Sequence, residues 1–217
     1  MAKKRSPGSV PPPKPASIVK IRSTPARREA FELWPNIDIL FLIGPAGTGK
    51  THLAVSLAVK AIREGVATKI IASRPTVQAG EDLGFLPGDL GEKLDPYMTP
   101  IFDVLKQVKQ PDEQIEVERA PLAFMRGRTF TDSVAILDEA QNCTYKQLKL
   151  FLTRIGQNNK LIITGDPEQS DLPGGVESLE QMLDDLDGVK RIGIIDIPET
   201  EVVRHPLIMN MLSRFRD

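Results

Sequence analysis

Short apolar runs alternate along the chain with stretches in which apolar residues recur every three or four positions. The runs predict buried strands, and the three-and-four spacing predicts amphipathic helices. Predicted strands cover 39–43, 69–73, 115–117, 134–137, 161–163 and 192–197. Predicted helices cover 53–62, 100–108, 122–125, 145–155, 176–186 and 207–215. This alternation predicts an α/β fold, with a mostly parallel sheet and helices on both of its faces.

One stretch interrupts the alternation. Residues 80–100 are rich in Gly and Pro, which favours a loop, and a loop this long inside a compact domain is usually functional or disordered. Five apolar residues within it argue against disorder: Leu83, Phe85, Leu86, Leu90 and Leu94. We therefore expect an ordered, functional loop here, ahead of the helix at 100–108.

The N-terminal region has a different composition from the rest. Residues 1–30 carry eight Lys or Arg residues against one acid, Glu29, whereas the whole chain has a net charge of −1. Six prolines also lie in this region, with few apolar residues to bury. We expect residues 1–23 to be a disordered basic tail and 24–217 to be the folded domain. The tail could tether nucleic acid electrostatically or simply aid solubility.

Length and composition narrow the class of protein. A chain of 217 residues with 41% apolar and 26% charged residues has the profile of one soluble globular domain. No apolar run approaches the ~20 residues of a membrane span, and no apolar segment of a secretory signal is present. The lone Cys143 excludes an internal disulfide and has no metal-spaced partner. We expect a cytoplasmic protein without a membrane partner.

The first predicted strand leads directly into a phosphate-binding pattern. Residues 44–51 match G-x-x-x-x-G-K-[ST] without a mismatch: Gly44, Pro45, Ala46, Gly47, Thr48, Gly49, Lys50 and Thr51. The glycines let backbone N–H groups approach phosphate oxygens, and the positive end of the following helix points at the same anion. Lys50 would then reach the β- and γ-phosphates of ATP, and the Thr51 hydroxyl would complete the shell of a Mg²⁺ ion. His52 adjoins the loop and is grouped with the nucleotide-contacting residues, with packing as the alternative.

Two later strands end in polar residues that should face the same edge of the sheet. Asp138 and Glu139 follow the strand at 134–137, where Asp138 would hold Mg²⁺ through water and Glu139 would polarise the attacking water. After the strand at 161–163, Thr164 or Gln169 could sense the γ-phosphate. Asp166 could belong to the same site, with a structural role in a turn or a helix cap as the alternative.

With these motifs in place, the chain resembles the PhoH-like ATPase family over roughly residues 24–217. The matching stretches are GPAGTGKTHLA (44–54), SRPTVQAGEDLGFLPGDLGEKLDPY (73–97), VAILDEAQN (134–142), TGDPEQSDLP (164–173) and EVVRHPL (201–207). The family is similar to the first motor domain of superfamily 1 helicases, which implies a RecA-like fold and an association with RNA. The resemblance also implies that Lys50 and Thr51 bind Mg-ATP and that Asp138 and Glu139 form the acidic motif. Gln169 becomes the γ-phosphate sensor and Arg204 a candidate arginine finger, although Arg204 could instead make a surface or packing salt bridge.

The chain departs from the family pattern near its start. Ahead of the first strand the family often has Thr-Pro-Asn-Gln, whose Gln resembles an adenine-reading residue, whereas this chain reads Thr24-Pro25-Ala26-Arg27. Arg27 could stack on a base, or Phe31 and Trp34 could pack against one, with surface and core roles as the alternatives. Longer members of the family add a nuclease-like or C-terminal domain, and we expect neither in 217 residues.

The function that these features favour is a Mg²⁺-dependent ATP hydrolase coupled to RNA or single-stranded nucleic acid. A helicase of this type needs two motor domains, so a lone domain is expected to act in a homo-oligomeric ring, possibly a hexamer. An ATP-switched module that regulates a partner such as a nuclease is the alternative. A small-molecule or nucleotide kinase is a further alternative, against which the Asp138–Glu139 pair and the GDPEQ stretch both count.

Overall fold

A sheet of six parallel strands forms the centre of the computed structural model, which describes residues 23–75, 90–170, 177–202 and 211. The strands are β1 (Ile39–Ile43), β2 (Lys69–Ser73), β3 (Glu116–Arg119), β4 (Ser133–Leu137), β5 (Asn159–Gly165) and β6 (Ile192–Asp196). Their order is β3-β2-β4-β5-β1-β6, and every neighbouring pair runs parallel. The predicted α/β architecture with a parallel sheet is confirmed.

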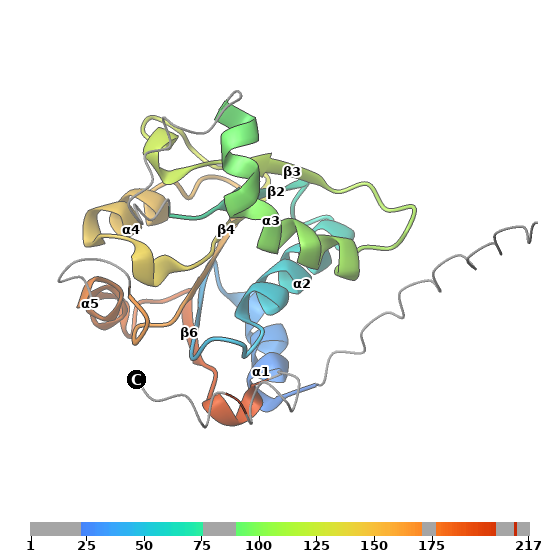
Figure 1. The fold of residues 1–217 in the computed structure, drawn as a ribbon. Helices are drawn as coiled ribbons and strands as arrows, with labels where there is room; N and C mark the ends of the chain where they lie inside the picture. The colour runs from blue at the N-terminus through green and yellow to red at the C-terminus, as the bar shows by residue number, and fades with distance from the viewer. Residues whose placement is uncertain (1–22, 76–89, 171–176, 203–210, 212–217) are drawn as a thin grey trace, which may run out of the picture.

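Helices cover both faces of this sheet (Figure 1). One face carries α1 (Pro25–Leu33), α2 (Lys50–Arg63) and α3 (Leu90–Val108), and the other carries α4 (Tyr145–Leu152) and α5 (Glu177–Leu186). Short 3₁₀ turns are η1 (Trp34–Asn36), η3 (Leu122–Phe124), η4 (Ala140–Asn142) and η5 (Glu199–Glu201). In β1, Leu40 and Leu42 pack towards α1–α3 while Phe41 and Ile43 pack towards α4 and α5. Burial on both faces explains why the strands read as continuous apolar runs.

The strand order brings the ends of three strands together. β5 lies between β1 and β4, so the segments that follow these three strands leave the same edge of the sheet side by side. Those segments carry the loop that begins at Gly44, the acidic pair that begins at Asp138, and the turn at Asp166. The fold therefore gathers the predicted motifs at the carboxyl edge, where open α/β sheets place their ligands.

A helix that the sequence analysis did not predict precedes the first strand. In α1, the Thr24 hydroxyl accepts a hydrogen bond from the backbone N–H of Arg27 at 3.3 Å, and Pro25 takes the first helical position. Ala26 and Ala30 are buried against the sheet. The helix therefore has an ordinary cap and start signal, but its buried face is too narrow to stand out as an apolar period.

The loop predicted at 80–100 is partly wrong, because α3 begins at Leu90 and not near residue 100. Pro96 and Pro100 both lie inside α3, where each lacks the N–H needed for one helical hydrogen bond. Burial of Ile101 and Leu105 in the core shared with α2 favours the helix despite that loss. Residues 76–89 lie outside the described part of the chain.

Other predicted boundaries shift by only a few residues. The third strand covers Glu116–Arg119 and not 115–117. The helix predicted at 122–125 is the 3₁₀ turn η3, and α4 ends at Leu152 and not at 155. Arg204, all of the predicted tail at 1–23 except Ser23, and all of the predicted helix at 207–215 except Met211 fall outside the described residues. Among the helices that are described, none is long and apolar enough to cross a bilayer.

Candidate nucleotide-binding site

The loop between β1 and α2 has a backbone that only glycine adopts readily. Gly44 has φ 146°, and a Cβ placed there would lie 2.2 Å from the backbone oxygen of Ile197. Gly47 and Gly49 have φ values of 85° and 83°, in the left-handed region. Gly49 is also the residue from which α2 starts. The local geometry is therefore that of a phosphate-binding loop opening onto a helix N-terminus.

Lys50 folds back across this loop. Its ammonium donates hydrogen bonds to the carbonyl oxygens of Gly44, at 2.5 Å, and Pro45, at 2.9 Å. The Thr48 hydroxyl donates to the same Pro45 oxygen at 2.9 Å. The lysine charge and the positive end of α2 thus lie together at the loop, an arrangement that favours an anion.

Asp138 is the most buried charged group of the site, with 1% of its surface exposed. Its Oδ1 accepts hydrogen bonds from the hydroxyls of Thr51, at 2.8 Å, and Thr164, at 2.6 Å. Its Oδ2 is buried and accepts no hydrogen bond from the described residues. Burial raises the pKa of the Asp138 carboxyl above its usual range, while the Thr164 and Thr51 hydrogen bonds act in the opposite direction.

These groups suit Mg²⁺. The Thr51 hydroxyl and the Asp138 carboxylate are hard oxygen ligands, and Oδ2 is a buried acceptor whose hydrogen-bonding capacity is unused. In the described part of the chain, no three His, Cys, Asp or Glu side chains cluster as a metal site of their own. A Mg²⁺ ion held here would therefore take its remaining ligands from phosphate oxygens and water, as this ion commonly does.

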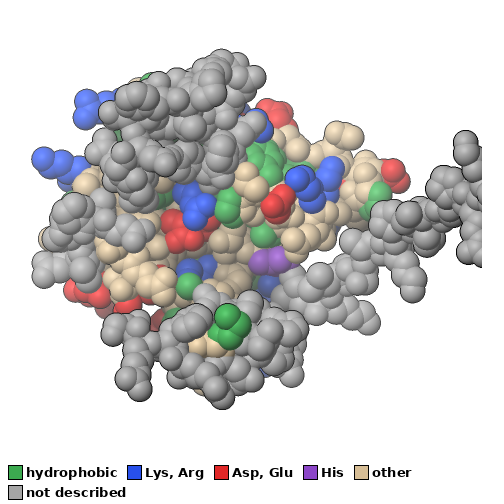
Figure 2. Space-filling view, in the orientation of Figure 1, with side chains coloured by type: hydrophobic (Ala, Val, Ile, Leu, Met, Phe, Trp, Pro, Cys, Tyr) green, Lys and Arg blue, Asp and Glu red, His purple; other side chains and the backbone are tan. Residues whose placement is uncertain are grey.

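Glu139 follows in a left-handed backbone conformation, with φ 59°. Its Oε2 accepts a hydrogen bond from the side-chain amide of Gln141 at 2.6 Å. Its Oε1 lies 3.2 Å from Nη2 of Arg74, whose Nε lies 3.9 Å from Asp138 Oδ2. Figure 2 shows Lys/Arg and Asp/Glu side chains adjoining near the centre of this face, with the histidine close by. One arginine therefore faces both carboxylates.

Arg74 and Gln141 make contacts at the site that the sequence did not predict. Gln141 is buried, and its side-chain oxygen accepts the backbone N–H of Asp166 at 3.1 Å, which links the acidic motif to the end of β5. Arg74 directly follows β2, and that position at the ligand edge of the sheet was the available signal for it. Gln141 lies within the stretch 134–142 that matches the family, but nothing in the sequence distinguished it as a site residue.

Thr164, Asp166 and Gln169 make different contacts. The Thr164 hydroxyl donates to Asp138, which links the end of β5 to the acidic pair. Asp166 makes a turn, because its Oδ1 accepts the N–H of Glu168 at 3.2 Å and its carbonyl accepts the N–H of Gln169 at 3.0 Å. The structure thus shows Asp166 in a turn, which is part of the structural alternative considered for it. The Gln169 side chain is exposed beyond the end of β5.

Comparison with known proteins gives the family. The family model described as PhoH-like protein matches residues 19–216. This chain belongs to the PhoH-like protein family. A PhoH-like protein of Bacillus subtilis (strain 168) is 50% identical over 202 residues, covering 88% of this chain and 62% of the relative. Protein PhoH of Escherichia coli (strain K12) is 43% identical over 187 residues, covering 82% of this chain and 53% of the relative. The chain thus spans little more than half the length of these relatives.

Solved structures place the fold among the P-loop NTPases. The large terminase of a thermophilic bacteriophage aligns with a TM-score of 0.60 at 13% identity, covering 89% of this chain and 50% of that chain. The same terminase in complex with ADP aligns with a TM-score of 0.57 at 12% identity, with the same coverage. At this identity the similarity is one of fold, and it agrees with the RecA-like sheet of this PhoH-like chain.

Arg27, at the position where the family pattern often has a Gln, packs against neighbouring residues of α1 and α2. Arg27 donates to the Ser56 hydroxyl at 3.1 Å and lies 5.6 Å from the centre of the Phe31 ring. Ser56 Oγ is also 3.1 Å from Nδ1 of His52, next to the loop. Burial, with the nearby Arg27 charge, lowers the pKa of His52 to about 4, so this imidazole is neutral at pH 7. Trp34 is buried in the core, so the structure shows the core role and not packing against a base.

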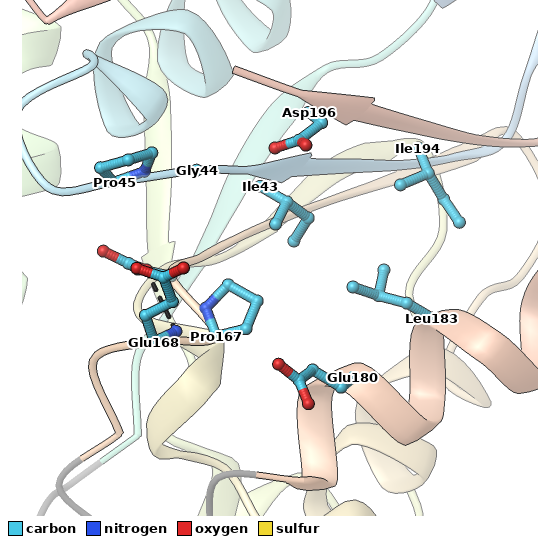
Figure 3. Close-up of a pocket in the computed structure, with 10 residues that line it drawn as sticks. Ile43, Gly44, Pro45, Pro167, Glu168, Glu180, Leu183, Ile194 and Asp196 are labelled. Carbon is cyan, nitrogen blue, oxygen red and sulfur yellow. Dashed lines mark hydrogen bonds between the residues drawn. The ribbon is translucent and has the colours of Figure 1, made fainter. Parts of the chain in front are cut away.

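A pocket of about 330 Å³ adjoins Gly44 and Pro45 of the loop (Figure 3). Its apolar lining includes Ile43 from β1, Ile194 from β6 and Leu183 from α5. Its lining also includes four acidic residues: Asp166, Glu168, Glu180 and Asp196. Four acids would repel a phosphate chain, so this pocket is a poorer candidate for the phosphates than the Lys50 side of the loop.

Proposed function

We propose that this PhoH-like chain binds Mg-ATP at the loop 44–51 and hydrolyses it. The observation that carries the proposal is the Asp138 carboxylate, which accepts hydrogen bonds from Thr51 of the loop and from Thr164 of β5. That contact joins the lysine-bearing loop to the acidic motif in one site. A chance glycine-rich turn would not place a buried carboxylate against the hydroxyl that follows its lysine.

Each residue then has a defined task. The loop amides and Lys50 hold the phosphates, and Thr51 and Asp138 hold the metal, with His52 beside them. When bound, Mg²⁺ would neutralise charge on the β- and γ-phosphate oxygens. Glu139 would take a proton from the attacking water. Gln169 is the proposed γ-phosphate sensor, and Arg204 is the proposed finger.

For partners, we propose RNA or single-stranded nucleic acid, and a homo-oligomeric ring such as a hexamer, in which Arg204 acts at the site of a neighbouring subunit. The excess of positive charge in residues 1–30 supports the nucleic-acid part. The family resemblance supports both parts.

The test is ATP hydrolysis measured with and without single-stranded RNA, together with the native mass of the chain. Stimulation by RNA and a mass of several subunits are the expected results. Phosphate appearing on an added acceptor would instead make the chain a kinase, and slow hydrolysis indifferent to RNA would make it an ATP-switched module. The Glu139→Gln variant, purified identically, reports the contribution of contaminating ATPases.

A truncated chain tests whether the basic N-terminal tail contributes to RNA binding. Deleting residues 1–22 removes six of the eight Lys and Arg residues in 1–30. If these residues contact phosphates, RNA affinity and its dependence on salt should both fall, because each contact releases condensed counterions. Basal hydrolysis should stay unchanged. An unaltered salt dependence would leave the tail as a solubility feature.

A further inference from the structure

Arg74 sits where the strand register brings it to the acidic pair. It follows Ser73, the last residue of β2, which pairs with Leu137, the last residue of β4. The backbone N–H of Asp138 donates to the Ser73 carbonyl at 3.0 Å, so the two strands remain in contact at this point. The arginine position is therefore set by the sheet itself.

The contacts of Arg74 engage the carboxylate that the proposed reaction needs. Its Nη2 lies 3.2 Å from Oε1 of Glu139, while Gln141 donates to Oε2 at 2.6 Å. Both oxygens of the proposed base therefore have partners. The Arg74 side chain is 23% exposed, and a guanidinium keeps its charge at any physiological pH.

The ion pair occupies one oxygen of the proposed base. The Arg74 guanidinium contacts both acids, because its Nε lies 3.9 Å from Asp138 Oδ2 while its Nη2 lies 3.2 Å from Glu139 Oε1. An attacking water would have to compete with Arg74 for Oε1 and with Gln141 for Oε2 of Glu139. A base must lie within hydrogen-bonding reach of the water from which it takes a proton.

We propose that Arg74 is a positioning residue that holds Glu139 in a resting position, and that hydrolysis requires this ion pair to loosen. The inference rests on the proposed function, in which Glu139 is the base. Arg74 limits turnover by acting through Glu139, so its effect should disappear when residue 139 carries no charge.

The test begins with basal turnover at saturating Mg-ATP. Arg74→Gln is expected to raise the rate about three- to tenfold with the Glu139 charge present, and to change it less than about twofold in a Glu139→Gln background. Arg74→Lys keeps the charge and should stay within about twofold of the unaltered chain. A fall or no change in Arg74→Gln, or an equal rise in both backgrounds, would overturn the proposal.

The matched control is Arg63→Gln. Arg63 also pairs with a glutamate, Glu113, through hydrogen bonds of 2.8 and 2.6 Å. It lies at the far end of α2, about 20 Å from the loop at the helical rise per residue. This variant loses the same charge and the same kind of ion pair, so its turnover should match that of the unaltered chain.

A second readout needs no nucleotide. Thermal unfolding of the free chain should show that Arg74→Gln and Glu139→Gln are not additive, because either change breaks the same ion pair. Additive shifts would contradict the pairing. If the unaltered chain shows no Mg-dependent turnover while the unfolding shifts are non-additive, the proposed function fails and the ion pair stands.

Discussion

Asp138 is a charged group that the fold buries at an energetic cost. Its raised pKa means that the folded chain binds a proton more readily than the unfolded chain. The carboxyl therefore favours folding most below its unfolded pKa, and that contribution is lost as pH rises through the folded value. At any pH above the folded pKa, the buried ionised carboxylate opposes folding.

Asp138→Asn should consequently stabilise the free chain at pH 8, by on the order of 1 kcal/mol, and less as the pH falls towards 4. The same variant should weaken Mg-dependent nucleotide binding, because it loses the metal-binding charge. Thermal unfolding at pH 8 and pH 5 measures the first effect, and nucleotide titration at varied Mg²⁺ measures the second. A variant less stable than the unaltered chain at pH 8 would contradict this account of the site.

Glu139→Gln keeps the shape of the side chain and removes the base. Nucleotide affinity should stay the same, and single-turnover hydrolysis should slow by about 10²–10⁴-fold. Rapid quench with labelled ATP measures the chemical step directly. Turnover equal to that of the unaltered chain would assign the base to another group.

At the level of single residues, roles could be predicted from the sequence only where the residues concerned are contiguous and form one motif. The run Gly44–Thr51 and the pair Asp138–Glu139 carry their chemistry within one motif each. The contacts of Arg74 and Gln141 arise only when β2 and β4 pair and the segment after β4 turns back towards β5. Such contacts depend on register, which no local pattern contains.

At the level of elements, Gly44 shows how the sheet and the loop depend on each other. Gly44→Ala places a methyl group against the Ile197 backbone oxygen, at 2.2 Å, in a conformation that alanine avoids. Gly188 also has a positive φ, 70°, but a Cβ there meets nothing within 4 Å. Gly188→Ala should cost about 1 kcal/mol of unfolding free energy and Gly44→Ala at least about 2. Equal costs in urea unfolding would show that the Ile197 contact relaxes freely.

The helices and strands also show where tertiary packing overrides the secondary structure that local sequence patterns predict. The central strands were predicted closely because burial on both faces makes them unbroken apolar runs. The start of α3 was predicted ten residues too late, since Pro96 and Pro100 argue for a loop locally whereas the core around Ile101 favours a helix. α1 was missed because its buried face consists largely of small residues.

At the level of the whole molecule, the finger proposal predicts that subunits share their active sites. Arg204→Ala should bind ATP and assemble but lose most hydrolysis, since a finger typically contributes 10³–10⁵ in rate, or roughly 4–7 kcal/mol. Mixing it with Lys50→Ala subunits should restore some activity, because an intact loop then meets an intact arginine at some interfaces. Absence of recovery in oligomers shown to be mixed would exclude a finger acting between subunits.

The central claim is that the loop around Lys50 binds Mg-ATP. Lys50→Ala should leave the fold intact while removing the cation proposed to meet the β- and γ-phosphates. The decisive measurement is equilibrium titration of a fluorescent ATP analogue with Mg²⁺ into both chains, with circular dichroism to confirm folding. We predict saturable, Mg-dependent binding to the unaltered chain and at least about a hundredfold weaker binding to Lys50→Ala. Equal affinity of the two folded chains would contradict the account.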